Sequence, residues 1–243
     1  MVNRLKTKPK FKRFNDLKPE DINFNFHIHT IQTDGLSTPE EFIKEAINLK
    51  LKAIAFTEHV NKKSEWFNSF KKRIDVCKKN NRIKIFFGIE SKAIDFKGTL
   101  DATKKMIEDT DIVIGVVHRY PDGRGGLTSF NAIKNLNFKK AAQIEFKATS
   151  GLLGNKNIDI LGHPFGVYSR FFNEFPEYYL KKIFIESIKR NIAIEINTKY
   201  LLEMKFLLRL FKEINPYVSL GSDAHHIKEL NKGFDNLKKG IKK

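Results

Sequence analysis

The segment Phe26-His27-Ile28-His29-Thr30, with Asp34-Gly35 shortly after it, decides how the rest of the chain is interpreted. It lies in a short apolar run that begins at Phe24, which is typical of a β-strand. Alternate residues of a strand point to the same face, so we expect the two imidazoles to lie side by side. Two neutral imidazoles can begin a metal site. Histidines on an exposed edge strand are the alternative, so the other ligands must be sought elsewhere in the chain.

The length and composition limit the possible answers. With 243 residues, 41% of them hydrophobic and 12% aromatic, the chain can form one α/β barrel or two small globular domains. Cys77 is the only cysteine, which excludes an internal disulfide and a thiolate metal cluster. Any metal must therefore be held by His, Asp and Glu, and we interpret Cys77 as a small packing residue.

The termini and hydropathy predict an intracellular protein. No apolar run reaches the roughly 18 residues of a membrane-spanning helix, so no membrane partner is expected. The basic N-terminus is not followed by an apolar segment of signal-peptide length. We therefore expect a cytoplasmic location.

The formal net charge of +17 raises the question of a nucleic-acid partner. Only nine of the 45 basic residues are arginine, the residue expected for bidentate contacts with phosphates and bases. Most lysines fall in stretches with a helical pattern. Solvated surface charge is therefore the favoured explanation, and nucleic-acid binding is the alternative.

Short apolar runs alternate with amphipathic stretches along the chain. The apolar runs predict seven strands, at residues 23–29, 53–57, 83–89, 112–117, 158–161, 193–196 and 218–220. The amphipathic stretches predict helices at 38–49, 65–80, 100–108, 138–149, 178–190 and 199–214. The first helix has a clear start signal, because Ser37 or Thr38 can cap it and Pro39 suits its first turn.

Strands that alternate with helices predict a parallel sheet. Seven strands in about 240 residues favour a single domain built as a closed or nearly closed TIM-like β/α barrel, with an open doubly wound sheet as the alternative. We assign 22–237 to the barrel domain, 1–21 to a basic extension and 238–243 to a basic, solvated tail. The long connection 119–157 contains a glycine-rich turn at 121–126, which is either a mobile loop at the site or an ordinary surface loop.

Six of the seven histidines fall at or just after the predicted strand ends. This is the end of a β/α barrel where active sites are built, and randomly placed histidines would rarely all fall there. The residues at this face are His27, His29, Asp34, His59, Glu90, His118, His163, Asp223 and His225. The pattern as a whole predicts a metal site, although each member alone would be weak evidence.

These motifs resemble, in their order, those of the PHP (polymerase and histidinol phosphatase) superfamily. The resemblance runs from about residue 23 to 226 and is carried by His27-x-His29 with Asp34-Gly35, Thr57-Glu58-His59, Gly88-Ile89-Glu90, His118, Gly162-His163-Pro164 and Ser222-Asp223-Ala224-His225. It implies a distorted seven-stranded barrel with three metal ions at the C-terminal face.

The resemblance also implies a ligand set. His27, His29, Glu90 and Asp223 would hold one ion, and Glu90 would bridge to a second ion held by His118 and His163. The third ion would be held by Asp34, His59 and His225. The chain departs from the common pattern at Asp34, where relatives often have histidine, and at Glu58, where aspartate is common. Imidazole and carboxylate ligands suit Zn, Mn or Fe. From this ligand set, two or three divalent ions are expected.

This centre would hydrolyse phosphoesters. Water that bridges two metal ions roughly 3.5–4 Å apart has its pKa lowered toward about 7, which gives a hydroxide able to attack phosphorus. The predicted substrate is a small phosphomonoester, as in histidinol phosphatases; a nuclease or nucleotide phosphoesterase is the alternative. The candidate catalytic residues are Glu90, Asp223, His225 and Arg119, and the candidate substrate contacts are Arg119, Lys92, Arg124 and His226. Asn197 is expected either to hydrogen-bond near the ligands or to shape a strand-end turn.

Overall fold

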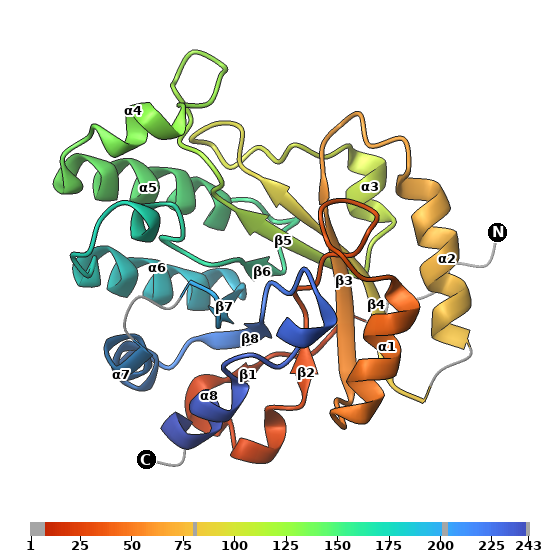
Figure 1. Cartoon of the computed structure of the whole chain (residues 1–243). Helices are drawn as coiled ribbons and strands as arrows, with labels where there is room; N and C mark the ends of the chain where they lie inside the picture. Colours follow the sequence, from red (N-terminus) through yellow and green to blue (C-terminus); the bar gives the residue numbers. More distant parts are fainter. Residues whose placement is uncertain (1–7, 80–81, 201–203, 242–243) are drawn as a thin grey trace.

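The predicted strands come together in one eight-stranded sheet, which Figure 1 shows in a computed structural model that describes residues 8–79, 82–200 and 204–241. The strands are β1 (Lys12–Arg13), β2 (Phe24–Asn25), β3 (Ala53–Val60), β4 (Lys84–Lys92), β5 (Ile112–Val116), β6 (Ile160–Leu161), β7 (Ala193–Asn197) and β8 (Tyr217–Gly221). Their order in the sheet is β1-β8-β7-β6-β5-β4-β3-β2.

The seven predicted strands correspond to β2 through β8, and each pairs in parallel with the next along the chain. The predicted strand count was one too low, because β1 adds an antiparallel strand in which Lys12 pairs with Val218. Two basic residues carry no apolar alternation, so the sequence pattern could not indicate this strand. The structure is thus a single α/β domain with a mostly parallel sheet.

The helices α1 to α7 lie in the connections between successive strands and pack around the sheet, and α8 follows the last strand (Figure 1). They are α1 (Pro39–Asn48), α2 (Phe67–Lys79), α3 (Lys104–Glu108), α4 (Phe130–Lys134), α5 (Phe138–Leu153), α6 (Glu177–Arg190), α7 (Met204–Ile214) and α8 (Phe234–Ile241), with short 3-10 turns at 14–16, 19–21, 168–170 and 227–229. Thr38 caps α1 in a reciprocal capping box with Glu41, which confirms the predicted start of this helix.

Three predicted regions need correction. The predicted helix at 100–108 begins at Lys104 in the structure. The predicted helix at 199–214 begins at Met204 in the structure, and residues 201–203 lie outside the described part of the chain. Residues 238–241, expected to be a solvated tail, belong to α8, whose Phe234 and Leu237 are buried. No helix in the described part of the chain is long and apolar enough to cross a membrane.

The strands are buried on both faces, as parallel strands usually are. In β5, Val113 packs in the larger apolar cluster shared with the helices. Its neighbours Ile112, Ile114 and Val116 pack in a second cluster with Phe86. By strand alternation, Glu90 lies on the same face of β4 as Phe86, so its side chain points above this second, inner cluster.

Backbone hydrogen bonds also join the chain after β2 to the chain around the end of β8. The Phe26 N–H donates to Leu220 O and the His29 N–H to Ala224 O, both at 2.9 Å. Ile28 and Ala224 form an isolated parallel bridge. These contacts bring the His27-x-His29 segment beside the Asp223-Ala224-His225 segment, although nearly 200 residues separate them.

Candidate metal centre

The predicted ligands lie together at the C-terminal ends of the parallel strands. His59 and Glu90 lie within the last residues of β3 and β4. The other histidines and Asp223 follow their strands by two to four residues, and Asp34 lies on the longer loop after β2. The parallel register sets His59 directly opposite Glu90. Because all parallel strands end at the same edge of the sheet, ligands that are distant in sequence meet there.

Glu90 is the centre of the arrangement, and its side chain is 1% exposed. Its Oε1 lies 3.0 Å from His163 Nε2 and 3.2 Å from both His118 Nε2 and His27 Nε2. Its Oε2 lies 2.5 Å from His59 Nδ1. Burial acts to raise the pKa of Glu90, but His118, His27 and His59 outweigh it and hold that pKa well below its usual range. Glu90 is therefore a carboxylate that these four imidazoles share, and His29 Nε2 lies 3.7 Å from its Oε2.

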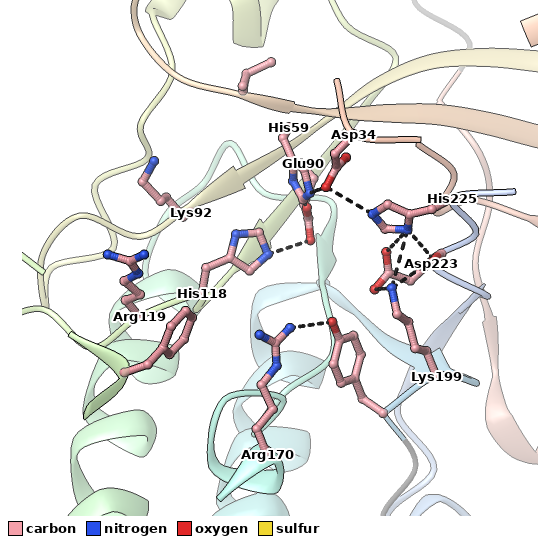
Figure 2. A pocket seen from close by; sticks show the side chains of 13 residues that line it. Asp34, His59, Glu90, Lys92, His118, Arg119, Arg170, Lys199, Asp223 and His225 are labelled. Atoms are coloured by element: carbon pink, nitrogen blue, oxygen red, sulfur yellow. Dashed lines mark hydrogen bonds and ion pairs between the residues drawn. The ribbon is translucent and has the colours of Figure 1, made fainter. Parts of the chain in front are cut away.

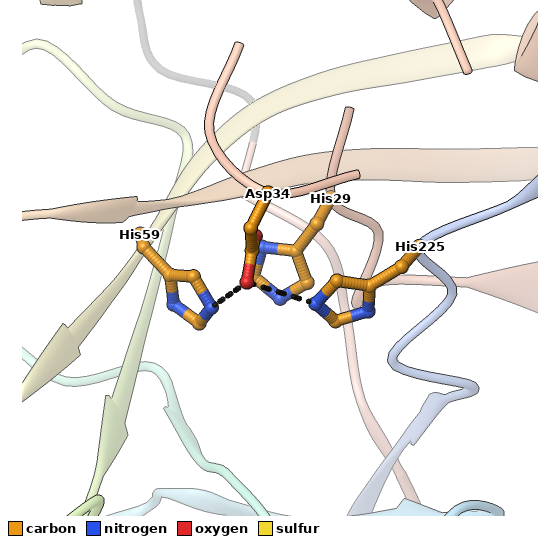
Figure 3. Close-up of side chains that lie close together, drawn as sticks. All are labelled: His29, Asp34, His59 and His225. Atoms are coloured by element: carbon orange, nitrogen blue, oxygen red, sulfur yellow. Dashed lines mark hydrogen bonds and ion pairs between the residues drawn. The ribbon is translucent and has the colours of Figure 1, made fainter. Parts of the chain in front are cut away.

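Asp34 is the centre of a second group, which Figure 3 shows. Its Oδ2 lies 3.2 Å from His225 Nε2 and 3.3 Å from His59 Nε2. The ring of His29 lies beside both imidazoles, with centroids 4.2 Å from His59 and 4.6 Å from His225. Burial acts to lower the pKa of His59, but Glu90 and Asp34 raise it to about 10. The side chain of Asp34 is 52% exposed, so this group lies at the open side of the centre.

Asp223 connects the two groups. Its Oδ1 lies 3.4 Å from His29 Nε2, and its Oδ2 lies 3.3 Å from Lys199 Nζ. Its φ of 50° places it in the left-handed region, a strained conformation for a residue other than glycine that often marks functional sites. Burial lowers the pKa of His29 to about 4, so its imidazole is neutral, the form that binds metals.

The unpaired atoms of the centre fit metal ions. His27 Nε2, both ring nitrogens of His29 and Glu90 Oε2 are buried and form no hydrogen bond of good geometry with the described residues, although His27 Nε2 and Glu90 Oε2 lie within ion-pair distance of a neighbouring group. Buried polar atoms of this kind are rare unless an ion or water satisfies them. Three sets have ligand atoms within 4.8 Å of one another: His29/Asp34/His59/His225, His27/His29/Asp223 and His59/Glu90/His118. Imidazole and carboxylate groups in these sets suit Zn, Mn or Fe.

Glu195, which the sequence analysis did not single out, supports the centre from below. Its Oε1 lies 2.6 Å from His27 Nδ1, and its Oε2 accepts hydrogen bonds from the His163 backbone N–H at 2.7 Å and from Asn197 Nδ2 at 3.2 Å. Because a carboxylate only accepts, His27 Nδ1 donates to Glu195, which leaves Nε2, on the side of Glu90, as the atom that could bind a metal ion. Gly221 leaves the space that Glu195 occupies, since a Cβ there would lie 2.0 Å from Glu195 Oε1.

A cavity of about 490 Å³ opens above the centre, and Figure 2 shows its lining. It is lined by Asp34, His59, Val60, Glu90, Lys92, His118, Arg119, Phe130, Arg170, Lys199, Tyr200, Asp223 and His225. Four of these side chains are basic. Lys92 and Arg119 were candidates from the sequence, whereas Arg170 and Lys199 were not. Lys92 pairs with Asp101 at 2.8 Å, which offsets part of its charge.

The other candidate residues occupy different positions. Arg124 and His226 do not line this cavity. Arg124 lies in an exposed turn in which its N–H donates to Asp122 Oδ1, and His226 Nδ1 accepts from the Lys228 N–H. Their assignment as substrate contacts stays a prediction without support from the cavity. Cys77 is buried in α2, in agreement with a packing role.

Glu58 lies beneath the loop that carries Asp34. Its carboxyl accepts hydrogen bonds from the Thr30 N–H at 2.9 Å, from Thr30 Oγ1 at 2.6 Å and from Thr33 Oγ1. Burial raises the pKa of Glu58 to about 7 despite these donors. The residue thus fixes the turn between His29 and Asp34 and does not contact the cavity.

The comparisons with known proteins agree with this geometry. A "probable phosphatase" of Caldicellulosiruptor saccharolyticus is 28% identical over 211 residues, which cover 82% of this chain and 78% of the relative. A "probable phosphatase" of Clostridium novyi is 26% identical over 215 residues, 82% of this chain and 77% of the relative.

A solved structure shares the fold. The histidinol phosphate phosphatase of Lactococcus lactis, determined with zinc, L-histidinol and phosphate, superposes with a TM-score of 0.68 at 23% identity and covers 90% of this chain and 92% of its own. The PHP domain family model matches residues 25–199, well over half of the chain. The protein therefore belongs to the PHP domain family.

Proposed function

We propose that this protein is a metal-dependent phosphoric ester hydrolase that acts on small phosphomonoesters. The observation that carries the proposal is the convergence of six imidazoles and three carboxylates at and beneath the floor of a cavity with four basic side chains in its lining. Ligands of this kind bind divalent ions, and basic side chains bind phosphate. The relatives named as phosphatases and the Lactococcus enzyme support the same activity.

The candidate ligands would be assigned to three metal ions. One ion would be held by His27, His29, Glu90 and Asp223, and a second by Glu90, His118 and His163. Asp34, His59 and His225 would hold a third ion. Such ions supply Lewis acidity and lower the pKa of water so that a hydroxide is available near neutral pH.

Arg119 would orient the phosphoryl group. It follows His118 directly in sequence and lines the cavity, and its guanidinium lies 4.8 Å from the centroid of Phe130, which holds it in place. In the overall reaction a water oxygen bonds to phosphorus, the ester P–O bond breaks and the leaving alcohol takes a proton. No side chain needs to form a covalent intermediate.

The sheet arrangement fits a distorted barrel. We propose that the contacts of Phe26 and His29 with Leu220 and Ala224 close the seven parallel strands, and the inner apolar cluster supports this proposal. Closure would explain why ligands from both ends of the chain meet. A cytoplasmic location stays a prediction.

The proposal is tested with protein loaded separately with Zn²⁺, Mn²⁺ and Fe²⁺. The substrates are histidinol phosphate, other small phosphomonoesters, nucleotides and short oligonucleotides, and released phosphate and oligonucleotide cleavage are measured. We expect release from one or more small phosphomonoesters and loss of this release in Asp223→Asn. Glu186→Gln, the removal of a carboxylate on the outside of α6, is the matched control and should be fully active.

Cleavage of oligonucleotides alone would overturn the small-substrate proposal and favour the nuclease alternative. Failure to retain more than a trace of any divalent ion after reconstitution would overturn the metal-dependent mechanism.

A further inference from the structure

The cavity offers no free carboxylate to a substrate. Its only acidic lining residues in the described part of the chain are Asp34, Glu90 and Asp223. Each of them contacts at least one imidazole of the candidate metal centre. A cationic group on the substrate would therefore have to compete with the metal ions and the imidazoles for these carboxylates.

Arg170, in contrast, has no acidic partner in the described part of the chain. Its Nη2 donates to the Tyr200 hydroxyl at 2.7 Å, and its guanidinium lies 5.3 Å from the Tyr200 ring and 5.9 Å from the Phe130 ring. One hydrogen bond to a phenol leaves most of its five N–H donors unused. In Figure 2 this side chain points into the cavity from the side away from Asp34.

The backbone that carries Arg170 is held firmly. Arg170 ends the short 3-10 turn Tyr168–Arg170, and the buried Glu145 of α5 accepts the N–H groups of Tyr168 at 2.7 Å and Val167 at 3.3 Å. The Tyr120 hydroxyl donates to the same carboxylate at 2.9 Å. An exposed arginine on an anchored turn loses less conformational entropy on binding a ligand than one on a loose loop.

Arg170 also lies one layer further out than the metal ligands. It contacts Tyr200, and the ring of Tyr200 lies 4.9 Å from the ring of His163. No contact joins Arg170 to an imidazole or carboxylate of the centre among the described residues. A phosphoryl group held by Arg119 and by metal ions at Glu90 would therefore direct the rest of the substrate toward Arg170 and the rings of Phe130 and Tyr200.

We propose that Arg170 selects phosphomonoesters whose leaving group carries a second anionic group, a carboxylate or another phosphate, over those that carry an ammonium group. This inference rests on the proposed phosphatase function. Guanidinium binds both anions through paired hydrogen bonds, and it repels an ammonium group. The two aromatic rings add apolar surface for the carbon skeleton of the leaving group.

The test compares small phosphomonoesters that differ mainly in the group remote from phosphorus. These are phosphoglycolate (carboxylate), ethyl phosphate (neutral), phosphoethanolamine (ammonium) and 1,3-propanediol bisphosphate (second phosphate). With the metal-loaded protein we expect kcat/KM for the preferred anionic substrate to exceed that for ethyl phosphate by about 10- to 100-fold, the range of a hydrogen bond to a charged group. Phosphoethanolamine should be the poorest substrate. Comparison of phosphoglycolate with 1,3-propanediol bisphosphate shows whether Arg170 prefers a carboxylate or a second phosphate.

Arg170→Gln should abolish this preference and leave kcat/KM for ethyl phosphate within about threefold. Arg170→Lys keeps the positive charge but lacks the planar guanidinium group, so it should retain part of the preference for anionic substrates. Arg190→Gln is the matched control, because Arg190 pairs with Glu186 on the outer surface of α6. Phosphonates are not hydrolysed, so their inhibition constants report binding alone. Inhibition should be strongest for 3-phosphonopropionate, weaker for ethylphosphonate and weakest for 2-aminoethylphosphonate.

Equal use of phosphoethanolamine and the anionic substrates would overturn the proposal. An Arg170→Gln variant that loses activity equally on all substrates would also overturn it, because Arg170 would then hold the transferred phosphoryl group. If no substrate releases phosphate, the phosphatase function fails, and the order of phosphonate binding still decides the selectivity of Arg170.

Discussion

Replacing Glu195 with glutamine is expected to weaken metal binding without unfolding the protein. The carboxylate of Glu195 lies on β7 beneath the centre and accepts from His27 Nδ1, the His163 N–H and Asn197 Nδ2. Glutamine has nearly the same shape but presents one donor and one acceptor in place of two acceptors. The NH₂ group of the glutamine must therefore face another hydrogen-bond donor, with which it cannot form a hydrogen bond.

The structure indicates which contact is lost. The amide oxygen can replace Oε2, because two donors point there, and the NH₂ group then faces His27 Nδ1. His27 would have to move its proton to Nε2, the atom that faces Glu90 and would bind a metal ion. The lost charge-assisted hydrogen bond contributes about 1.5–3 kcal/mol. This corresponds to a reduction in metal affinity of about 10- to 100-fold.

Zinc affinity is measured by competition with a chromophoric chelator, and the unfolding midpoint in urea is measured in parallel. Glu186→Gln, the same chemical change on the outer face of α6, is the control. Nitrogen-15 spectra of the histidine side chains report the tautomer directly, and we expect the Nδ1–H form of His27 in the wild type. Zinc affinity within about twofold of the wild type, with the fold intact, would refute the reasoning.

Three further variants test other contacts. Asp34→Asn removes the charge that faces two imidazoles at the open side of the centre, so elemental analysis should find one metal ion fewer per chain; an unchanged metal content would contradict the assigned third site. Gly221→Ala places a methyl group 2.0 Å from Glu195 Oε1, so it should lower the free energy of unfolding by about 1–3 kcal/mol and weaken zinc binding; a variant as stable as the wild type would show that Glu195 can move aside. Burial raises the pKa of Glu145 from 4.5 to about 7, so the folded state holds a proton that the unfolded state has released, and stability falls by about 3 kcal/mol as pH rises through this window. Urea unfolding at pH 5 and pH 8 should show this loss in the wild type relative to Glu145→Gln, and an equal difference at both pH values would exclude it.

Much of the fold and site could be predicted because they follow from two simple regularities. The alternation expected of an extended segment groups His27 with His29, whose ring centroids lie 5.0 Å apart although β2 itself ends at Asn25. Parallel strands bring their C-terminal ends to one edge. These rules were enough to group the nine candidate ligands, which the structure brings together. Their binding of metal stays a prediction that the experiments above address.

Glu195 and Arg170 could not be predicted, for different reasons. Glu195 lies within the alternating run Ala193–Asn197, where a polar residue usually points to solvent, and only the position of the inner cluster shows that it points inward. Arg170 depends on the path of the chain after His163, which Glu145 fixes from another helix. Strand register and local pattern contain no information on such contacts between distant segments.

The junction of Ile28 with Ala224 has a consequence for the order of events during synthesis. The first and last ligands in sequence occupy neighbouring positions, so a nascent chain that has not reached residue 225 lacks part of the site. Contacts of such long sequence separation form slowly, because the intervening chain must be ordered first. If the centre binds metal ions as proposed, the complete site is available only in a chain synthesised beyond residue 225, and a shorter nascent chain would offer an ion only part of its ligand set.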